Sequence, residues 1–400
     1  MESWERNVWA LALVVFIAFV GFQFFSPFLP LYVMELGVTD PTRVALWSGV
    51  LTAVTPAVSG LLGPLWGSFA DRVGRKMMMV RSLVGFVIIV AAMGLVTSVT
   101  QLLILRILQG VIAGFSVFAM ALASVSCPKE RVPVAIGRVQ GAQLLSVAIG
   151  PAAGGYVASH FGLRYAFFVT AGMCALALVG LLVLFTETRA TQTGPVAATP
   201  ESGFTLRQVL TARGFPLVLV LLFVGQFIDR GLGLLVPLKV AVLPDVTHIA
   251  ATSGEIISLA AVCATGSALL AGRLAQRWPA ERLLLVSLVV GGLPCALMAF
   301  APGWQSLMLF RCLTGLCLGG ALTLAYSIGG ALVTGERRGA AFGWLALSVQ
   351  IGTAASPLVS GGLAAISLPG AFVLDGALAW VAAGVLLLGA RHLRRGAAHA

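Results

Sequence analysis

Long apolar stretches recur along the whole 400-residue chain and constrain its fold more than any other feature of the sequence. Each is long enough to cross a hydrocarbon core about 30 Å thick, because an α-helix rises about 1.5 Å per residue. They lie at about 8–32, 44–69, 77–97, 101–124, 133–158, 164–185, 215–239, 254–275, 283–301, 305–330, 339–364 and 370–390. The pattern predicts an all-α membrane protein with twelve transmembrane helices.

The composition excludes a soluble protein of this size. Hydrophobic residues make up 59% of the chain and charged residues only 10%, which leaves too little polar surface to face water. No small-residue cleavage site follows the first apolar stretch, so we interpret it as a membrane span and not as a cleaved signal. The six cysteines are scattered without metal-ligand or CxxC spacing, and we expect them to pack as small apolar residues.

The formal net charge of +11 would favour a nucleic-acid partner in a soluble protein, but here the positions of the charges indicate topology. If the N-terminus is inside and the spans alternate, 19 of the 25 Lys and Arg residues fall on the cytoplasmic side. Only Arg43, Arg164 and Lys239 fall outside. This asymmetry follows the positive-inside rule. We therefore expect both termini in the cytoplasm and no nucleic-acid partner.

The chain contains an internal repeat. Residues 105–110 match 310–315 at an offset of 205, and a Glu-Arg pair, a glycine and a proline match at an offset of 206. A polar stretch at 186–213 separates the copies and is typical of a flexible linker. We predict an N-terminal six-helix half at 1–185, a cytoplasmic linker at 186–213 and a C-terminal six-helix half at 214–400. Parallel repeats of this kind place a substrate site at the membrane midplane, between the halves.

Three motifs carry a resemblance to a known family. The loop after the second span reads GSFADRVGRK at 67–76, and the fourth span contains RILQG at 106–110. The fifth span contains Gly137, Ser146, Gly150, Pro151, Gly154 and Gly155. With these motifs the whole chain resembles the major facilitator superfamily, and most of all its twelve-span bacterial drug:proton antiporters. The resemblance implies a secondary transporter that works by alternating access.

The loop at 67–76 is predicted to act as a gate. Two glycines permit a tight turn, and the aspartate can pair with the cations around it or with a helix N-terminus. Such contacts can hold the two halves in one state and release them in the next. The gating-loop residues are Gly67, Asp71, Arg72, Gly74, Arg75 and Lys76. The alternative is that the basic residues only anchor the topology.

The small residues of the fifth span indicate close helix packing. Pro151 removes one backbone hydrogen bond and can bend the helix. We therefore assign Gly150, Pro151, Gly154 and Gly155 to a bend in this span. The resemblance associates this motif with export.

Polar and charged residues inside the spans are the strongest site candidates. A charge at mid-bilayer depth costs at least about 2.5 kcal/mol, so it usually faces a cavity or a partner. In the seventh span, Gln226, Asp229, Arg230 and Gly233 share one helix face by their spacing. The candidate proton-coupling and cavity residues are Asp229, Arg230, Arg106, Gln23, Gln109, Gln226 and Arg311.

Asp229 is the one carboxylate that we expect deep in the membrane, and it has two interpretations. It can form a structural ion pair with Arg230 or Arg106, or it can carry a proton as access alternates. Arginine stays charged and no histidine lies within a span, so Asp229 is the first candidate for a proton carrier. Asp375 and Glu255, nearer the outer ends of their spans, follow it. The first half offers no deep carboxylate, which departs from drug antiporters with an acidic residue in span 1.

We predict a secondary active transporter, not an enzyme, that exports small amphipathic compounds in exchange for protons. One alternative is an organic-anion or sugar-type transporter or facilitator, favoured by three arginines against one aspartate inside the spans. The other is a transport-inactive membrane receptor or scaffold, which the intact loop motif argues against. No Walker-type phosphate loop is present, and no cofactor or metal is expected. The expected partners are a small-molecule substrate, protons and the lipid bilayer, for a monomer in the bacterial inner membrane.

Overall fold

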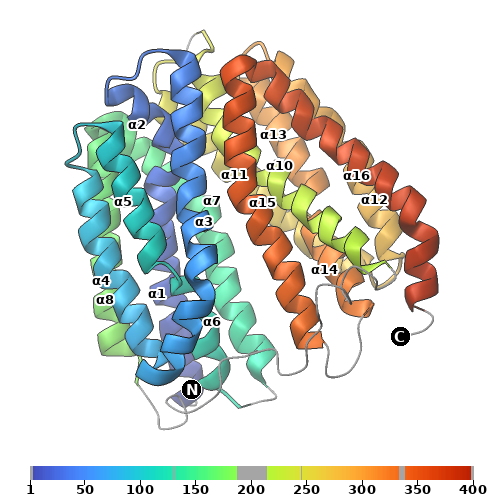
Figure 1. Cartoon of the computed structure of the whole chain (residues 1–400), viewed down its shortest axis with the longest axis horizontal. Helices are drawn as coiled ribbons and strands as arrows, with labels where there is room; N and C mark the ends of the chain where they lie inside the picture. The colour runs from blue at the N-terminus through green and yellow to red at the C-terminus, as the bar shows by residue number, and fades with distance from the viewer. Residues whose placement is uncertain (1–2, 129–130, 187–213, 245, 333–337, 398–400) are drawn as a thin grey trace. The chain divides into compact units, whose positions relative to one another are not determined.

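The computed structural model describes residues 3–128, 131–186, 214–244, 246–332 and 338–397. These residues form helices and contain no strand (Figure 1). Within the described residues, twelve segments are long and apolar enough to cross a membrane, which confirms the predicted fold class. The predicted linker at 186–213 lies, apart from its first residue, outside the described residues.

The helical elements differ widely in length, from three residues in η1 and η4 to 33 residues in α3. In chain order they are α1 (Ser3–Phe25), η1 (Ser26–Phe28), α2 (Leu29–Glu35), α3 (Pro41–Val73), α4 (Arg75–Met93), α5 (Val99–Ile112), α6 (Phe115–Val125), α7 (Val132–Phe161), α8 (Leu163–Leu184), α10 (Phe215–Ala241), α11 (Ile249–Leu274), α12 (Ala280–Leu297), η4 (Met298–Phe300), α13 (Trp304–Leu318), α14 (Ala321–Ala331), α15 (Arg338–Ile366) and α16 (Leu368–Ala397).

Some spans are interrupted, which the apolar pattern did not predict. The first span consists of α1, η1 and α2, because Pro27 and Pro30 lack the N–H groups that a continuous helix needs. The fourth span is interrupted between α5 and α6 at Gly114. The φ of Gly114 is 118°, a conformation that glycine adopts readily and that strains other residues. Hydropathy detects the length of a span but not such local breaks.

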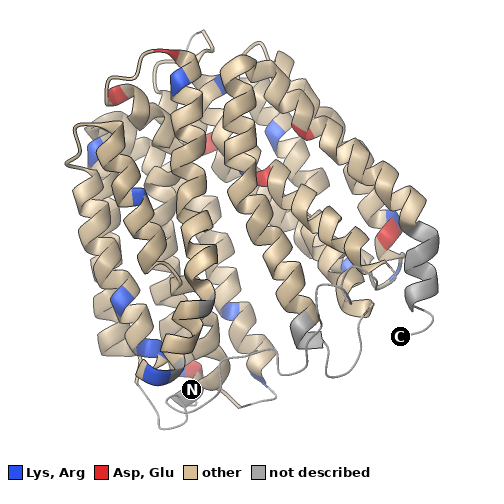
Figure 2. Ribbon diagram, in the orientation of Figure 1, with Lys and Arg blue, Asp and Glu red and all other residues tan. Residues whose placement is uncertain are grey.

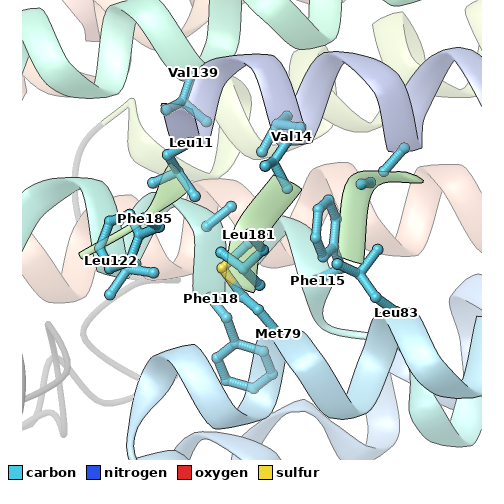
Figure 3. Packing of buried hydrophobic residues seen from close by; sticks show 14 of the residues in the cluster. Leu11, Val14, Met79, Leu83, Phe115, Phe118, Leu122, Val139, Leu181 and Phe185 are labelled. Atoms are coloured by element: carbon cyan, nitrogen blue, oxygen red, sulfur yellow. The ribbon is translucent and has the colours of Figure 1, made fainter. Parts of the chain in front are cut away.

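Unit 1, the first of two compact units, contains Met1–Thr39, Val54–Ala197 and His248–Ser258. Within it α1 packs against α7 and α8, and α4 packs against α8, α5 and α6. The core is a buried apolar cluster that includes Leu11, Val14, Met79, Leu83, Phe115, Phe118, Leu122, Val139, Leu181 and Phe185 (Figure 3). Since lipid is as apolar as these side chains, close packing stabilises the cluster more than transfer from water does.

Unit 2 contains Asp40–Ala53, Ala198–Thr247 and Leu259–Ala400. Within it α10 packs against α15 and α16, and α12 packs against α16 and α13. The same helix contacts occur in unit 1. In the sequence repeat, the counterparts of α1, α4, α7 and α8 are α10, α12, α15 and α16, in that order. The repeated sequence thus folds twice into the same helix packing.

The outward-facing side chains are largely apolar. Charged residues occupy few places along the helices (Figure 2). Large apolar side chains such as Leu61, Ile366 and Leu388 are 79%, 85% and 83% exposed. In water such a surface would drive aggregation, whereas a bilayer covers it.

Candidate transport site

An ion pair joins the seventh and tenth spans inside unit 2. Nη2 of Arg311 on α13 lies 3.4 Å from Oδ1 of Asp229, near the middle of α10. The Arg311 side chain is 9% exposed and the Asp229 side chain 56% exposed. The pair therefore consists of a buried cation and a carboxylate that remains accessible.

The ion-pair partner expected for Asp229 from the sequence, Arg230 or Arg106, is wrong. The structure pairs Asp229 with Arg311. Arg230 is the next residue along α10 and is exposed, and adjacent residues of a helix do not face each other. The true partner is 82 residues away, so only the packing of the helices reveals it.

The fourth span contributes a polar pair to unit 1. Nη1 of Arg106 donates a hydrogen bond to Oε1 of Gln109 at 2.7 Å, as their i, i+3 spacing permits, and both side chains are buried. The Arg106 guanidinium carbon lies 6.0 Å from the centre of the Phe25 ring. The Thr55 hydroxyl on α3 donates to the backbone carbonyl of Arg106 at 2.9 Å. The contacts with Gln109 and Phe25 hold the side chain of Arg106, and the Thr55 hydroxyl holds its backbone, within the helix bundle of unit 1.

Two other candidate glutamines, Gln23 and Gln226, lie against glycines of neighbouring helices. A Cβ added to Gly150 on α7 would overlap the Cβ of Gln23. A Cβ added to Gly352 on α15 would lie 3.3 Å from the Cβ of Gln226, which is buried. Gln23 is half-buried. The stems of both side chains are thus held in helix interfaces.

Asp375 on α16 is a buried carboxyl group whose surroundings the sequence did not reveal. It is 0% exposed, and neither carboxyl oxygen has a hydrogen-bond partner among the described residues. A Cβ added to Gly231 on α10 would lie 2.9 Å from Asp375 Oδ2, 2.7 Å from Ser360 Oγ and 3.2 Å from Ser356 Oγ. The serines at i and i+4 in the eleventh span are the sequence signal that could have indicated a polar face opposite Asp375.

The predicted turn at Gly67 is wrong, because α3 continues through this residue to Val73. The turn between α3 and α4 is made by Gly74 alone, whose φ is 96°. The side chain of Asp71 lies outside the described residues. Nζ of Lys76 donates to the backbone carbonyl of Phe185 at 3.1 Å and so connects α4 to the end of α8 within unit 1.

Arg81 and Trp66 form a cation–π contact that the sequence did not reveal. The guanidinium carbon of Arg81 lies 3.7 Å from the centre of the Trp66 ring. Nη2 of Arg81 donates to the carbonyls of Ile112 and Ala113 at 3.2 and 3.3 Å, and Nε1 of Trp66 donates to the carbonyl of Val111 at 2.8 Å. These donors satisfy carbonyls left free where α5 ends, and they stabilise the break in the fourth span.

The glycines of the fifth span face two different helices. A Cβ added to Gly154 would overlap the backbone of Phe24 on α1, and one added to Gly155 would overlap the carbonyl of Ala250 on α11. Pro151 lies inside α7, and the next N–H group, that of Ala152, donates to Ser258 Oγ at 2.9 Å. The motif therefore permits backbone contact within unit 1 on both sides of α7.

The same contact occurs in unit 2. A Cβ added to Gly361 on α15 would lie 2.8 Å from the carbonyl oxygen of Ala45, and one added to Gly49 on α3 would overlap the carbonyl of Pro357. In unit 1 a Cβ added to Gly254 would likewise overlap the carbonyl of Pro151. Each unit thus contains a helix pair in reciprocal glycine-to-carbonyl contact.

Twelve membrane-crossing helices in two repeated units, with an arginine–carboxylate pair between two spans, define a polytopic membrane transporter. The sequence model of the Major Facilitator Superfamily matches residues 11–246 and 231–399. The chain belongs to the Major Facilitator Superfamily, and it is a transporter and not an enzyme.

Similar bacterial proteins cover almost the whole chain. The multidrug resistance protein MdtG of Klebsiella pneumoniae (strain 342) is 32% identical over 368 residues, which is 91% of this chain and 88% of that protein. MdtG of Salmonella typhimurium is 33% identical over 368 residues, 91% of this chain and 90% of that protein. With the twelve apolar helices, these relatives indicate a multi-pass protein of the bacterial inner membrane.

Solved structures show the same fold at low sequence identity. A bacterial homolog of the human lysosomal transporter Spinster, in an inward-facing and occupied conformation, has a TM-score of 0.78 at 17% identity and covers 97% of each chain. The human organic anion transporter MFSD10 (TETRAN) has a TM-score of 0.68 at 16% identity, covering 96% of this chain and 100% of that one. These likenesses bear on the fold alone.

Proposed function

We propose that this transporter exports amphipathic compounds across the bacterial inner membrane in exchange for protons. The export of drug-like compounds is supported by the names of the MdtG relatives. Proton exchange is supported by one observation above all, the ion pair of unequal exposure between Asp229 and Arg311.

The unequal exposure of the pair has a mechanistic consequence. An accessible carboxylate in mid-span is costly against hydrocarbon, so its exposed side is expected to meet water or solute. In this proposal Asp229 binds a proton in one access state and loses it in the other, while Arg311 stabilises its ionised form. A cationic group on the substrate would compete with the proton for the same carboxylate, which gives exchange in place of cotransport.

Other residues are assigned supporting roles in the proposal. Gln23, Gln226 and Arg230 line the substrate path, and the Arg106–Gln109 pair provides a second polar contact for the solute. The segment at 67–76, which consists of the end of α3, the turn at Gly74 and the start of α4, acts as a gate with Asp71 as its carboxylate. The bend of the fifth span lets α7 change its packing. The protein is proposed to function as a monomer. The distribution of Lys and Arg supports a topology with both termini in the cytoplasm.

Transport in proteoliposomes tests the proposal. Purified full-length protein is reconstituted, a pH gradient is imposed, and uptake of the lipophilic cation tetraphenylphosphonium is compared with that of ethidium and of aromatic carboxylates. We expect uphill accumulation of a lipophilic cation that depends on the gradient and stops with a protonophore. Equal fluxes with and without the gradient would indicate a facilitator and contradict proton exchange.

Transport of organic anions is the second candidate function. It is favoured by the arginines inside the spans, since both Arg106 and Arg311 are buried and Arg230 adds a third positive charge. The carboxylates of the same solute panel test it. Saturable uptake of an aromatic carboxylate, together with no response to either cation, would favour this candidate over drug export.

A further inference from the structure

Asp375 is a buried carboxyl group that the proposed exchange does not yet use. It is 0% exposed, and both of its oxygens lack hydrogen-bond partners among the described residues. Ser360 on α15 is 1% exposed, and its hydroxyl also lacks a partner within this part of the chain. Both groups face one point on α10, because a Cβ at Gly231 would lie 2.9 Å from Asp375 Oδ2 and 2.7 Å from Ser360 Oγ.

This environment favours a neutral carboxylic acid. An ionised carboxylate without water or donors would be strongly destabilised, and such a group takes up a proton instead. The packing around it is tight, since a Cβ at the next residue, Gly376, would lie 2.7 Å from the carbonyl oxygen of Gly292 on α12. Asp375 in the described arrangement is therefore expected to hold a proton.

The groups that surround Asp375 come from four helices. Charge interactions link it to Arg311 on α13 and to the Cys295 thiol on α12. On α10 it faces Gly231, and α15 contributes Ser356 and Ser360. The Ser356 hydroxyl already donates to the carbonyl of Phe227 at 2.5 Å and is not free to donate to Asp375. Among these surrounding groups, Arg311 carries the positive charge.

Arg311 is paired with Asp229 and is close enough to Asp375 for its charge to act on that group. Its Nη2 lies 3.4 Å from Asp229 Oδ1, and its Nε is buried without a hydrogen-bond partner among the residues described. The Arg311 charge also acts on Asp375. The charge of Arg311 therefore bears on an accessible carboxylate and on a buried carboxyl group.

We propose that Asp375 is a second proton-binding site and that Arg311 is shared between Asp375 and Asp229. This inference rests on the proton exchange proposed above. When Asp229 is ionised it holds Arg311, and Asp375 keeps its proton. When Asp229 binds a proton or a cationic substrate, Arg311 turns to Asp375, and the Asp375 proton leaves to water as the carboxylate forms. When Asp229 is protonated, Asp375 supplies the one negative charge that faces Arg311. When a cationic substrate binds, both carboxylates are ionised, and the substrate and Arg311 each balance one of them.

Infrared spectroscopy of the reconstituted protein tests the protonation of Asp375 without any substrate. Wild type should show the C=O stretch of a protonated carboxylic acid at neutral pH. Asp375→Asn should lose this band, and it should fold normally because asparagine resembles the neutral acid. Glu35→Gln is the matched control, since Glu35 is exposed and lies 3.3 Å from Arg164. A neutral-pH band that survives in Asp375→Asn, or is absent in wild type, would overturn the proposal.

The sharing of Arg311 is tested by removing its other partner. In Asp229→Asn the freed guanidinium should stabilise ionised Asp375, so the ratio of protonated to ionised Asp375 at fixed pH should fall about tenfold or more. An unchanged ratio would show that Arg311 does not serve both groups.

Transport then separates this inference from the proposed function. In proteoliposomes, Asp375→Asn should keep downhill exchange and lose gradient-driven accumulation. If wild type accumulates a cation with the gradient and Asp375→Asn does so equally well, the second site is refuted while proton exchange stands. If wild type itself shows no dependence on the gradient, the proposed exchange fails first.

Discussion

The pairing of Asp229 with Arg311, and not with its neighbour Arg230, can be measured by a double-mutant cycle. The atoms are 3.4 Å apart, and Coulomb's law gives about 1 kcal/mol in a water-like medium and about 5 kcal/mol at an effective dielectric constant of about 20. Because Asp229 is 56% exposed, solvent screening favours the lower end. We therefore expect a coupling free energy of about 1–2 kcal/mol between the two side chains.

The single substitutions should differ in a way that follows from burial. Asp229→Asn removes the carboxylate that pairs with the buried Arg311 charge, so it should destabilise the protein by about 2 kcal/mol. This is less than the loss of a fully buried pair, because Asp375 can take over part of the pairing. Adding Arg311→Gln should recover part of that loss. Unfolding in mixed detergent micelles, titrated with dodecyl sulfate and followed by tryptophan fluorescence, gives the four free energies of the cycle.

The control is the cycle between Asp229→Asn and Arg230→Gln. Arg230 is exposed, and we expect these two changes to add within about 0.5 kcal/mol. Coupling to Arg230 together with additivity at Arg311 would refute the assignment and restore the pairing that the sequence favours.

Three further predictions concern packing, gating and topology. Gly155→Val should lower the stability of the protein by about 1–3 kcal/mol, because the side chain would collide with the Ala250 carbonyl. Gly141→Val on the same helix is the control, since its side chain meets open space. Thermal unfolding of both variants distinguishes them. Asp71→Asn should express normally and slow transport several-fold in the proteoliposome assay, since it removes a charge and little volume; unchanged turnover would leave the loop as a topology anchor. Cysteine in place of Arg207 should resist an impermeant thiol reagent applied to intact cells, and rapid labelling from outside would reverse the proposed topology.

The positions of the spans could be predicted from the sequence because the bilayer imposes a local rule. Every backbone polar group in hydrocarbon must be satisfied within its own helix, so length and hydropathy suffice to locate a span. The need to satisfy backbone groups within the helix also explains why the predicted turn at Gly67 is wrong. A glycine inside a helix costs only about 1 kcal/mol, and α3 continues through it to Val73. The turn falls instead at Gly74, where φ is 96°.

The sequence selected candidate residues for the site but did not predict the contacts between them. Asp229 and Arg311 were both selected, since a charge in a span is rare and costly. Their pairing depends on how α10 and α13 face each other, and the sequence spacing of Asp229 favoured nearby residues. The polar surroundings of Asp375 come from helices that are far apart in the sequence, so no local pattern contained them.

The sequence by itself determined that this chain crosses a membrane twelve times, that its two halves repeat, and that its family is one of transporters. These properties follow from hydropathy, periodicity and short motifs, each of which is a local pattern within a single helix or loop. Only the tertiary structure decided which carboxyl groups lie near Arg311, which glycines meet a carbonyl of another helix, and how completely Asp375 is buried. Those properties depend on the rotation of each helix about its axis, and packing against its neighbours sets that rotation.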